Sequence, residues 1–181
     1  MTTFKRIKNF FGAGDSSASL DWEEAYEELL PKVYNFFRYR FFNNDLAEEL
    51  TAVTLSRAWQ SRHRYQKDLA KFSTWVMGIA RHVALDEFRR RNAADEPLDD
   101  MDIWDSQTHI ENNVQVRQQI DELERHLSQL TADEQELIGL KYGAGLTNRA
   151  IAEVTGLSES NVGTTLHRIV KKLRVKMEIK I

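Results

Sequence analysis

Residues Thr147 to Lys172 read TNRAIAEVTGLSESNVGTTLHRIVKK and form the clearest structural pattern in this chain. Thr147 and Ser158 are N-cap residue types, and each precedes a run of apolar residues at helical spacing. Gly156, between the two runs, predicts a tight turn that ends the first helix. The pattern therefore predicts a short helix, a turn and a longer helix, which is the helix-turn-helix arrangement. We expect Val154 and Leu157 to fill the corner between the helices.

The longer helix should present a polar and basic face opposite its apolar one. Small hydrogen-bonding side chains near its N-terminus suit base edges, and later cations suit phosphates, so this face predicts duplex DNA binding. The alternative is a plain helical hairpin with a solvated basic face. Gly163 costs about 1 kcal/mol relative to Ala inside a helix, and close approach of the backbone to DNA is one reason for it. The face carries Ser160, Asn161, Thr164, Thr165, Arg168, Lys171 and Lys172.

The rest of the chain also has helical periodicity. Two prolines and eight glycines among 181 residues are few, which favours long helices over a β-sandwich or barrel. Pro31 predicts a kink or restart in the first helix, and Asn44 or Asp45 should cap the second. Thr131 to Glu134 form a capping box that starts a helix through about Tyr142. The other expected helices cover residues 20–40, 46–59, 71–91 and 114–130.

Composition excludes several classes of protein. The chain has no cysteine, so a disulfide scaffold, a thiolate zinc site and a cysteine nucleophile are excluded. No apolar run approaches the roughly 18 residues of a membrane span, and the N-terminus lacks the apolar core of a signal peptide. The five histidines lack HExxH spacing, and neither a glycine-rich phosphate loop nor a G-x-S-x-G motif occurs. We expect no enzymatic activity, no cofactor, no metal site and no small-molecule substrate.

Charge is segregated along the chain, although the net charge is only −3. Residues 62–94 and residues 137–181 each carry eight basic and three acidic residues, whereas residues 95–136 carry two basic and thirteen acidic ones. Two basic blocks around an acidic one predict two polyanion-binding surfaces with an acidic spacer. The spacer either shields the basic surfaces or is only a solvated tether.

Aromatic residues lie among the cations of the first basic block. Tyr65, Phe72 and Trp75 stand beside Arg64, Lys67 and Lys71, a mixture that suits stacking on unpaired bases of single-stranded DNA. The alternative is that the aromatic rings belong to the core. We favour the core for Trp75, and stacking for Tyr65, which lies in a polar loop.

Two sets of motifs resemble regions 2 and 4 of bacterial sigma factors of the extracytoplasmic-function (ECF) group. The first set is DLAEELTAVTLSRAW from Asp45 to Trp59, FSTW from Phe72, IAR from Ile79, ALD from Ala84 and RRR from Arg89. The second set is LTADEQ from Leu130, GLSESNV from Gly156 and LHR from Leu166. The resemblance covers about residues 20–92 and 115–178, with an acidic segment between the two sets.

The resemblance implies an all-α fold of two small helical domains joined by an acidic linker, with a helix-turn-helix in the C-terminal domain. Residues 1–19 would be a tail, 20–92 region 2, 93–114 the linker and 115–181 region 4. The implied function is to bind core RNA polymerase and direct promoter recognition and transcription initiation. The alternative is a helix-turn-helix repressor or activator that acts without being a polymerase subunit.

The resemblance also implies partners and site residues. Region 2 would dock on the clamp coiled coil of the polymerase β′ subunit and region 4 on the β flap. Promoter DNA and an anti-sigma factor are further expected partners, without membrane insertion. The protein would act in the bacterial cytoplasm, or be held at the inner membrane by its anti-sigma factor.

Each implied contact falls on particular residues. The −35 element would meet the face of the longer helix named above. Contacts to core polymerase would come from Asp45, Glu48, Glu49, Thr51, Thr54 and Arg57. Contacts to the −10 element would come from Arg64, Tyr65, Lys67, Lys71, Arg81, His82, Arg89 and Arg90. Relatives commonly have Asn at the position of His82, so we expect a different −10 preference.

Overall fold

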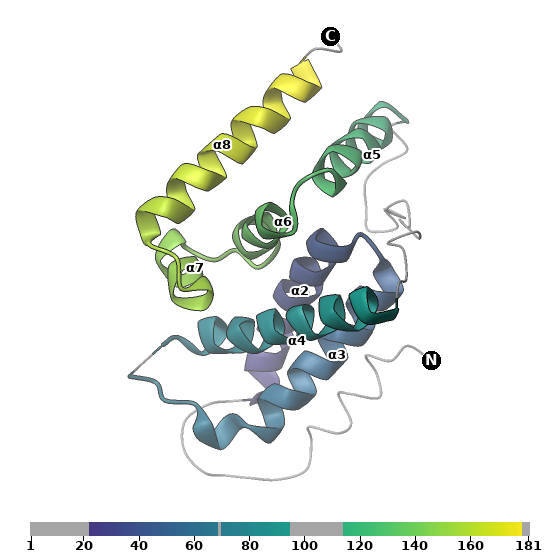
Figure 1. The fold of residues 1–181 in the computed structure, drawn as a ribbon. Coiled ribbons are helices and arrows are strands. Elements are labelled where there is room, and N and C mark those ends of the chain that lie inside the picture. The colour runs from purple at the N-terminus through teal and green to yellow at the C-terminus, as the bar shows by residue number, and fades with distance from the viewer. Residues whose placement is uncertain (1–21, 69, 95–113, 179–181) are drawn as a thin grey trace.

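The computed structural model describes residues 22–68, 70–94 and 114–178, and within these ranges every regular element is helical (Figure 1). The tail at 1–19 and nearly all of the expected linker lie outside the described residues. A first group of helices comprises α2 (Trp22–Phe41), α3 (Asn44–Gln60), the 3-10 turn η1 (Arg62–Arg64) and α4 (Phe72–Ala94). A second group comprises α5 (Val114–Ser128), α6 (Ala132–Ile138), the π-helical turn η2 (Gly139–Gly143), α7 (Asn148–Thr155) and α8 (Glu159–Glu178).

The first helix, α2, supplies most of the core of the first group. Val33, Phe36 and Phe37 are fully buried because they repeat at the three- and four-residue spacing of one helical face. The helix continues through Pro31, which is exposed, so the restart expected at this residue does not occur. An exposed proline keeps its ring in solvent, and packing of the opposite face holds the helix together.

The turn between α2 and α3 differs by one residue from the expectation. Phe42 takes a positive φ of 53°, and Asn43 is extended at the start of α3. The Asn43 side-chain oxygen accepts a hydrogen bond from the Leu46 backbone N–H at 2.7 Å. Asn43 is therefore the N-cap, and the choice of Asn44 or Asp45 was wrong.

The second group confirms the expected caps. The Thr131 side chain accepts from the Glu134 N–H at 3.3 Å, and the Glu134 carboxylate accepts from the Thr131 N–H at 3.1 Å, completing the capping box. The helix that follows was expected to run to about Tyr142. It is an α-helix only to Ile138 and then widens into η2, and Gly145 reverses the chain with a φ of 69°.

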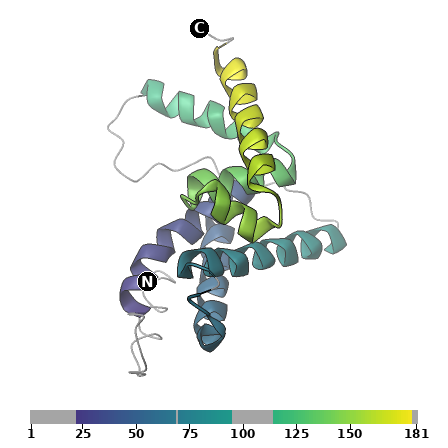
Figure 2. The same cartoon turned by 90° about the vertical axis from the view of Figure 1, so that its left-hand side faces the viewer.

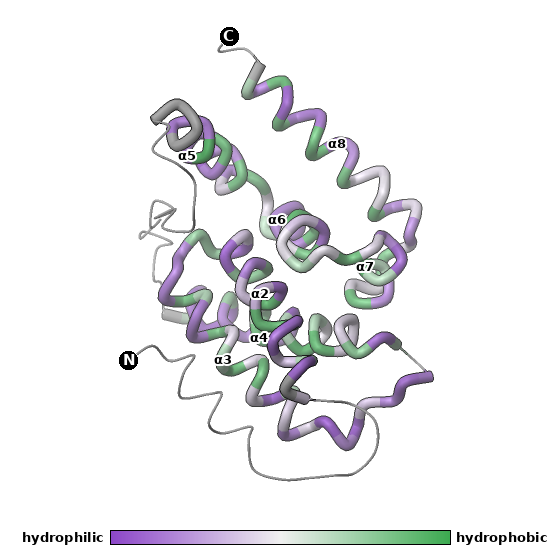
Figure 3. The backbone as a smooth tube through the Cα atoms, turned by 180° about the vertical axis from the view of Figure 1, so that it is seen from behind, coloured by the Kyte–Doolittle hydropathy of each residue, from purple (hydrophilic) through white to green (hydrophobic). Residues whose placement is uncertain are grey.

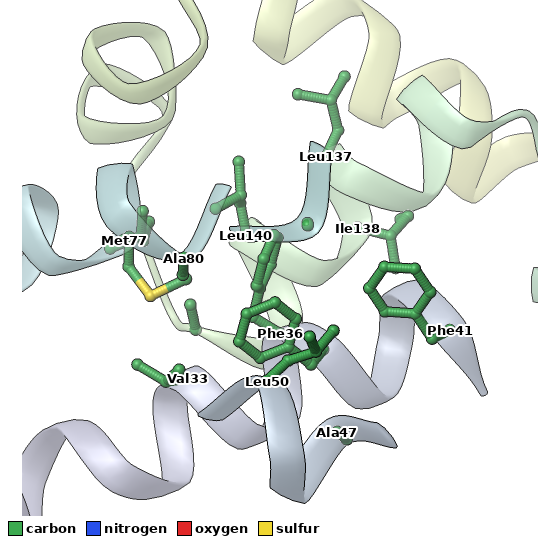
Figure 4. Close-up of a cluster of buried hydrophobic side chains, with 14 of the residues drawn as sticks. Val33, Phe36, Phe41, Ala47, Leu50, Met77, Ala80, Leu137, Ile138 and Leu140 are labelled. Carbon is green, nitrogen blue, oxygen red and sulfur yellow. The ribbon is translucent and has the colours of Figure 1, made fainter. Parts of the chain in front are cut away.

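The two groups pack on each other through one continuous hydrophobic core. In Figure 1, α6 lies above α2 and α7 lies above α4, and α2 also contacts η2. Phe36 and Phe41 of α2 face Leu140 and Ile138 of the second group in Figure 4. By contrast, α8 extends away from the first group, as Figures 1 and 2 show from two sides.

Hydropathy along α8 follows its packing. Hydrophobic and hydrophilic positions alternate along this helix in Figure 3, which is the pattern of one buried and one exposed face. Val162, Leu166, Ile169 and Leu173 are buried, as expected from their spacing. None of the described helices combines the length and the apolar character that crossing a bilayer requires.

Candidate nucleic-acid interface

The helix-turn-helix predicted from the sequence is present as α7, a turn and α8. The Thr147 hydroxyl accepts from the Ala150 N–H at 3.2 Å and caps α7. Gly156 ends α7 with a φ of 78°, a conformation that glycine adopts without strain. The Ser158 hydroxyl accepts from the Asn161 N–H at 3.2 Å at the start of α8. The two caps fix where α7 and α8 begin, and Gly156 makes the turn between them.

The polar face of α8 is open to solvent near its N-terminus. Ser160, Asn161, Thr164 and Arg168 are exposed, and Thr165 is half-buried. The Thr165 hydroxyl donates to the Asn161 side-chain oxygen at 3.1 Å, which leaves the amide NH₂ group of Asn161 as its outward donor. Lys171 and Lys172 are also exposed, and Lys172 lies 3.8 Å from the Glu134 carboxylate.

One expectation about this motif needs correction. Leu157 is 39% exposed and does not fill the corner, whereas Val154 packs against the core as expected. A Cβ on Gly163 would lie 3.4 Å from the Asn148 side chain of α7. At this distance the flexible Asn148 side chain would accommodate an alanine, so packing of α7 against α8 does not by itself require glycine here.

The loop before α4 brings its aromatic residues together. Tyr65 meets Phe72 at a ring-centroid distance of 4.9 Å and Trp75 at 5.6 Å, and its hydroxyl donates to the Ala70 carbonyl at 3.1 Å. Trp22 stacks on Trp59 at 5.3 Å and meets Phe72 edge-on at 5.0 Å. Tyr65 is thus half-buried in this aromatic cluster and does not project as a free ring. Trp75 packs against the core, as the sequence analysis favoured.

The cations of the loop and of α4 differ in their surroundings. Arg64, Lys67 and Lys71 are exposed in the loop. His82 is exposed on α4, and its Nδ1 lies 2.8 Å from the Gly78 carbonyl oxygen, which can only accept. The ring therefore donates from Nδ1, and a neutral His82 presents Nε2 outward as an acceptor.

The arginines at the end of α4 are held by two carboxylates. Glu87, which is buried, accepts from Arg90 at 2.9 Å and from Arg91 at 2.7 Å, and the hydrogen bond from Arg90 is the main reason why its pKa is lowered. Arg89 lies 3.8 Å from Asp86. Arg89 and Arg90 remain exposed, so both can also reach an external anion.

Two of the six residues expected on the exposed face of α3 lie in the core. Thr51 and Thr54 are fully buried, and their hydroxyls donate to the Ala47 and Leu50 carbonyls at 2.6 Å and 2.8 Å. These two residues cannot contact a partner from inside the core. A shallow hollow on the outer face of the helix is lined instead by Asp45, Glu48, Glu49, Ala52 and Val53.

That hollow follows one helical stripe. The positions i, i+3, i+4, i+7 and i+8 from Asp45 are the ones that line it, so the helical period of the acidic residues could have identified Ala52 and Val53. Val53 lines this hollow and also packs against the core. Arg57 is exposed further along α3 and pairs with Asp86 of α4 at 3.2 Å.

Comparison with known families covers both groups of helices. Residues 25–94 match sigma-70 region 2, and residues 120–173 match sigma-70 region 4. The two matches occur in that order and together span more than half of the chain. The chain belongs to the sigma-70 family. As a sigma factor, it directs RNA polymerase to promoters and serves transcription initiation.

Curated relatives place this sigma factor in the ECF group. The ECF RNA polymerase sigma factor SigX of Bacillus subtilis (strain 168) is 29% identical over 160 residues, covering 85% of this chain and 82% of SigX. The ECF sigma factor RpoE of Cereibacter sphaeroides is 26% identical over 154 residues, covering 85% and 84%. The resemblance noted in the sequence is thus confirmed.

Solved structures show the same fold. The sigma factor RpoE of Bartonella quintana, solved with the anti-sigma factor NepR, matches with a TM-score of 0.73 at 19% identity, covering 89% of this chain and 99% of that one. CnrH, solved with the cytosolic domain of CnrY, matches with a TM-score of 0.61 at 17% identity, covering 98% of both chains. The expected all-α fold of two helical domains is confirmed.

Proposed function

We propose that this sigma factor reads a −35 element with α8 and a −10 element with α4 and the loop before it, while α3 binds core polymerase. The observation that carries the proposal is the α8 face, where capped geometry presents Asn161 and Thr164 at the start of the helix and Arg168 further along it. A helix N-terminus with short polar side chains suits base edges, and later cations suit phosphates.

The −10 contacts would come from exposed groups around α4. Arg64, Lys67 and Lys71 supply cations beside the aromatic cluster, and His82 supplies an acceptor at Nε2. Arg89 and Arg90 add positive charge further along α4. A flipped base would stack on the rim of the cluster, since Tyr65 and Trp75 are half-buried and not fully enclosed.

Core polymerase would bind the stripe from Asp45 to Val53 on α3. Carboxylates around a small apolar hollow suit a partner with complementary cations and an apolar side chain. The clamp coiled coil of β′ is the proposed partner of this stripe, with Arg57 at its end. The second group would bind the β flap.

We further propose that the protein has no catalytic activity of its own, and that it works in the bacterial cytoplasm because core polymerase works there. RpoE of Bartonella quintana, which shares this fold, has been solved in complex with an anti-sigma factor, which supports an anti-sigma factor as a partner here. Such a partner could also hold the protein at the inner membrane.

The test is in vitro transcription with purified core polymerase and a pool of genomic promoter fragments. We expect promoter-dependent transcripts only when the protein is added, and co-purification of the protein with core. A stand-alone repressor or activator would instead bind a palindromic duplex tightly without polymerase and would start no transcript.

A further inference from the structure

Two arginines of the first group meet one glutamate of the second group at the buried contact between them. Arg81 of α4 lies 3.3 Å (Nε to Oε1) from Glu136 of α6, and Arg40 of α2 lies 3.9 Å (Nη2 to Oε1) from the same oxygen. Arg40 is 3% exposed and Glu136 is 6% exposed. The contact therefore places the Arg40 guanidinium and the Glu136 carboxylate out of water, while the Arg81 side chain is 25% exposed.

The carboxylate does not satisfy the two guanidinium groups. Among the described residues, Arg40 Nε and Nη1 and Arg81 Nε are buried without a hydrogen-bond partner. Burial lowers the pKa of Arg40 and the nearby Arg81 lowers it further, while Glu136 and then Asp133 act in the opposite direction. The cluster thus retains unpaired donors and a net positive charge, which an anion with two free oxygens can use.

Both arginines belong to the first group, and Arg40 has a contact within that group that does not involve α6. The Arg40 guanidinium lies over the Phe88 ring of α4 at 4.7 Å, which holds it beside that helix. Arg81 precedes His82 on the same helix. If α6 moved away, the pair would become an exposed anion site on α4, next to the proposed −10 contacts.

We propose that Arg40 and Arg81 form a binding site for a backbone phosphate of promoter DNA, and that the Glu136 carboxylate occupies this site while the two groups are packed together. The proposal rests on the proposed DNA binding by α4. A phosphodiester brings two free oxygens where Glu136 Oε1 alone meets both groups, and planar guanidinium groups bind such oxygens in pairs. A DNA strand fits better than an isolated phosphate because further cations, Arg89 and Arg90, lie exposed on the same helix.

The experiment separates the two groups in the full chain by two independent changes. Glu136→Gln removes the competing charge, and Gly143→Ala places a Cβ 2.9 Å from the Asn35 backbone without touching any charge. Because the chain has no cysteine, Gln60→Cys with Arg174→Cys can carry a fluorophore pair that reports separation. We expect both changes to increase the distance between the fluorophores.

Binding of labelled single-stranded promoter DNA to the free protein is then measured over a salt series. We expect roughly tenfold tighter binding in both opened variants, and a log K versus log salt slope steeper by about 0.7, the contribution of one phosphate contact on a single strand. Adding Arg40→Gln and Arg81→Gln to the Gly143→Ala variant should cancel the extra slope. Arg125→Gln, an exposed position on α5, is the matched control and should leave it unchanged.

Four results would overturn the inference. The first is that the two groups separate but the slope of log K against log salt stays as in the wild type. The second is that the opened variant keeps its steeper slope after both arginines are replaced. The third is no separation in either variant. Inorganic phosphate that competes as well as DNA at equal ionic strength would assign the site to free phosphate and contradict a DNA site. Transcription with core polymerase distinguishes failure of this inference from failure of the proposed function. A wild-type protein that starts no transcript would contradict the proposed function itself.

Discussion

Gly143 of η2 lies directly against the backbone of Asn35 in α2. A Cβ at Gly143 would lie 2.9 Å from both the carbonyl carbon and the carbonyl oxygen of Asn35, closer than real Cβ contacts allow. Backbone atoms cannot rotate away as a flexible side chain can. The absence of a side chain at Gly143 is therefore a condition for the close packing of the two groups.

Gly143→Ala should lower the free energy of unfolding by about 1–3 kcal/mol, the usual cost of overpacking a core. Gly78→Ala in α4 is the matched control, because nothing lies within 4 Å of its Cβ position. That change should be neutral or raise stability by about 0.5–1 kcal/mol. Urea unfolding of both variants measures the difference, and equal stability would contradict close packing at Gly143.

Glu87→Gln should remove part of the acid sensitivity of the protein. The hydrogen bonds from Arg90 and Arg91 lower the pKa of Glu87 below its usual 4.5. The stabilisation is present above the unfolded-state pKa and is lost as pH falls through the folded-state pKa. The wild type should therefore lose more stability than the variant between about pH 5 and pH 3. Unfolding curves across this range test the sign, with Glu49→Gln on the exposed face of α3 as the control.

Asn161→Ala and Arg168→Ala should affect −35 recognition in different ways. Loss of the Asn161 amide should change base preference at one position, by about 1–3 kcal/mol for a good base contact. Loss of the Arg168 cation should weaken all sequences alike and lower the salt slope by about one. Binding of the polymerase holoenzyme to a set of −35 variants provides the measurement. A uniform loss for Asn161→Ala would contradict its reading role.

Thr165→Val tests how Asn161 is oriented. The Thr165 hydroxyl engages the Asn161 side-chain oxygen, so its removal frees the amide to rotate and present either group. We expect broader base preference with little change in total affinity. A preference as narrow as that of the wild type would show that DNA alone orients the amide.

Glu49→Lys and Thr54→Val should separate polymerase binding from stability. Glu49 is exposed on the α3 stripe, and reversal of its charge should weaken binding to core polymerase about tenfold or more, a loss of about 1.4 kcal/mol. Thr54 is buried, so Thr54→Val should change thermal stability while leaving the affinity for core unchanged. Fluorescence titration with core polymerase checks both, and a loss of affinity in Thr54→Val would restore its original assignment.

Local patterns in the sequence determined the helices and their ends. The capping box at Thr131, the cap at Thr147 and the left-handed Gly156 all act within a few residues, so each could be identified from spacing alone. The helix-turn-helix and the family resemblance followed from the same local information. The N-cap of α3 is Asn43, one residue earlier than expected, and it follows Phe42, which takes a positive φ. The residue type of Phe42 does not indicate this conformation.

Tertiary structure decided which residues face solvent and which meet each other. Helical periodicity defines a face, but it does not say which of two polar faces is buried, and so Thr51 and Thr54 were placed outside. The pairing of Arg81 with Glu136 joins residues 55 positions apart, and the approach of Gly143 to Asn35 joins residues 108 positions apart. Such contacts depend on how two groups of helices pack, because burial and ion pairing are properties of the assembled core and not of any one segment.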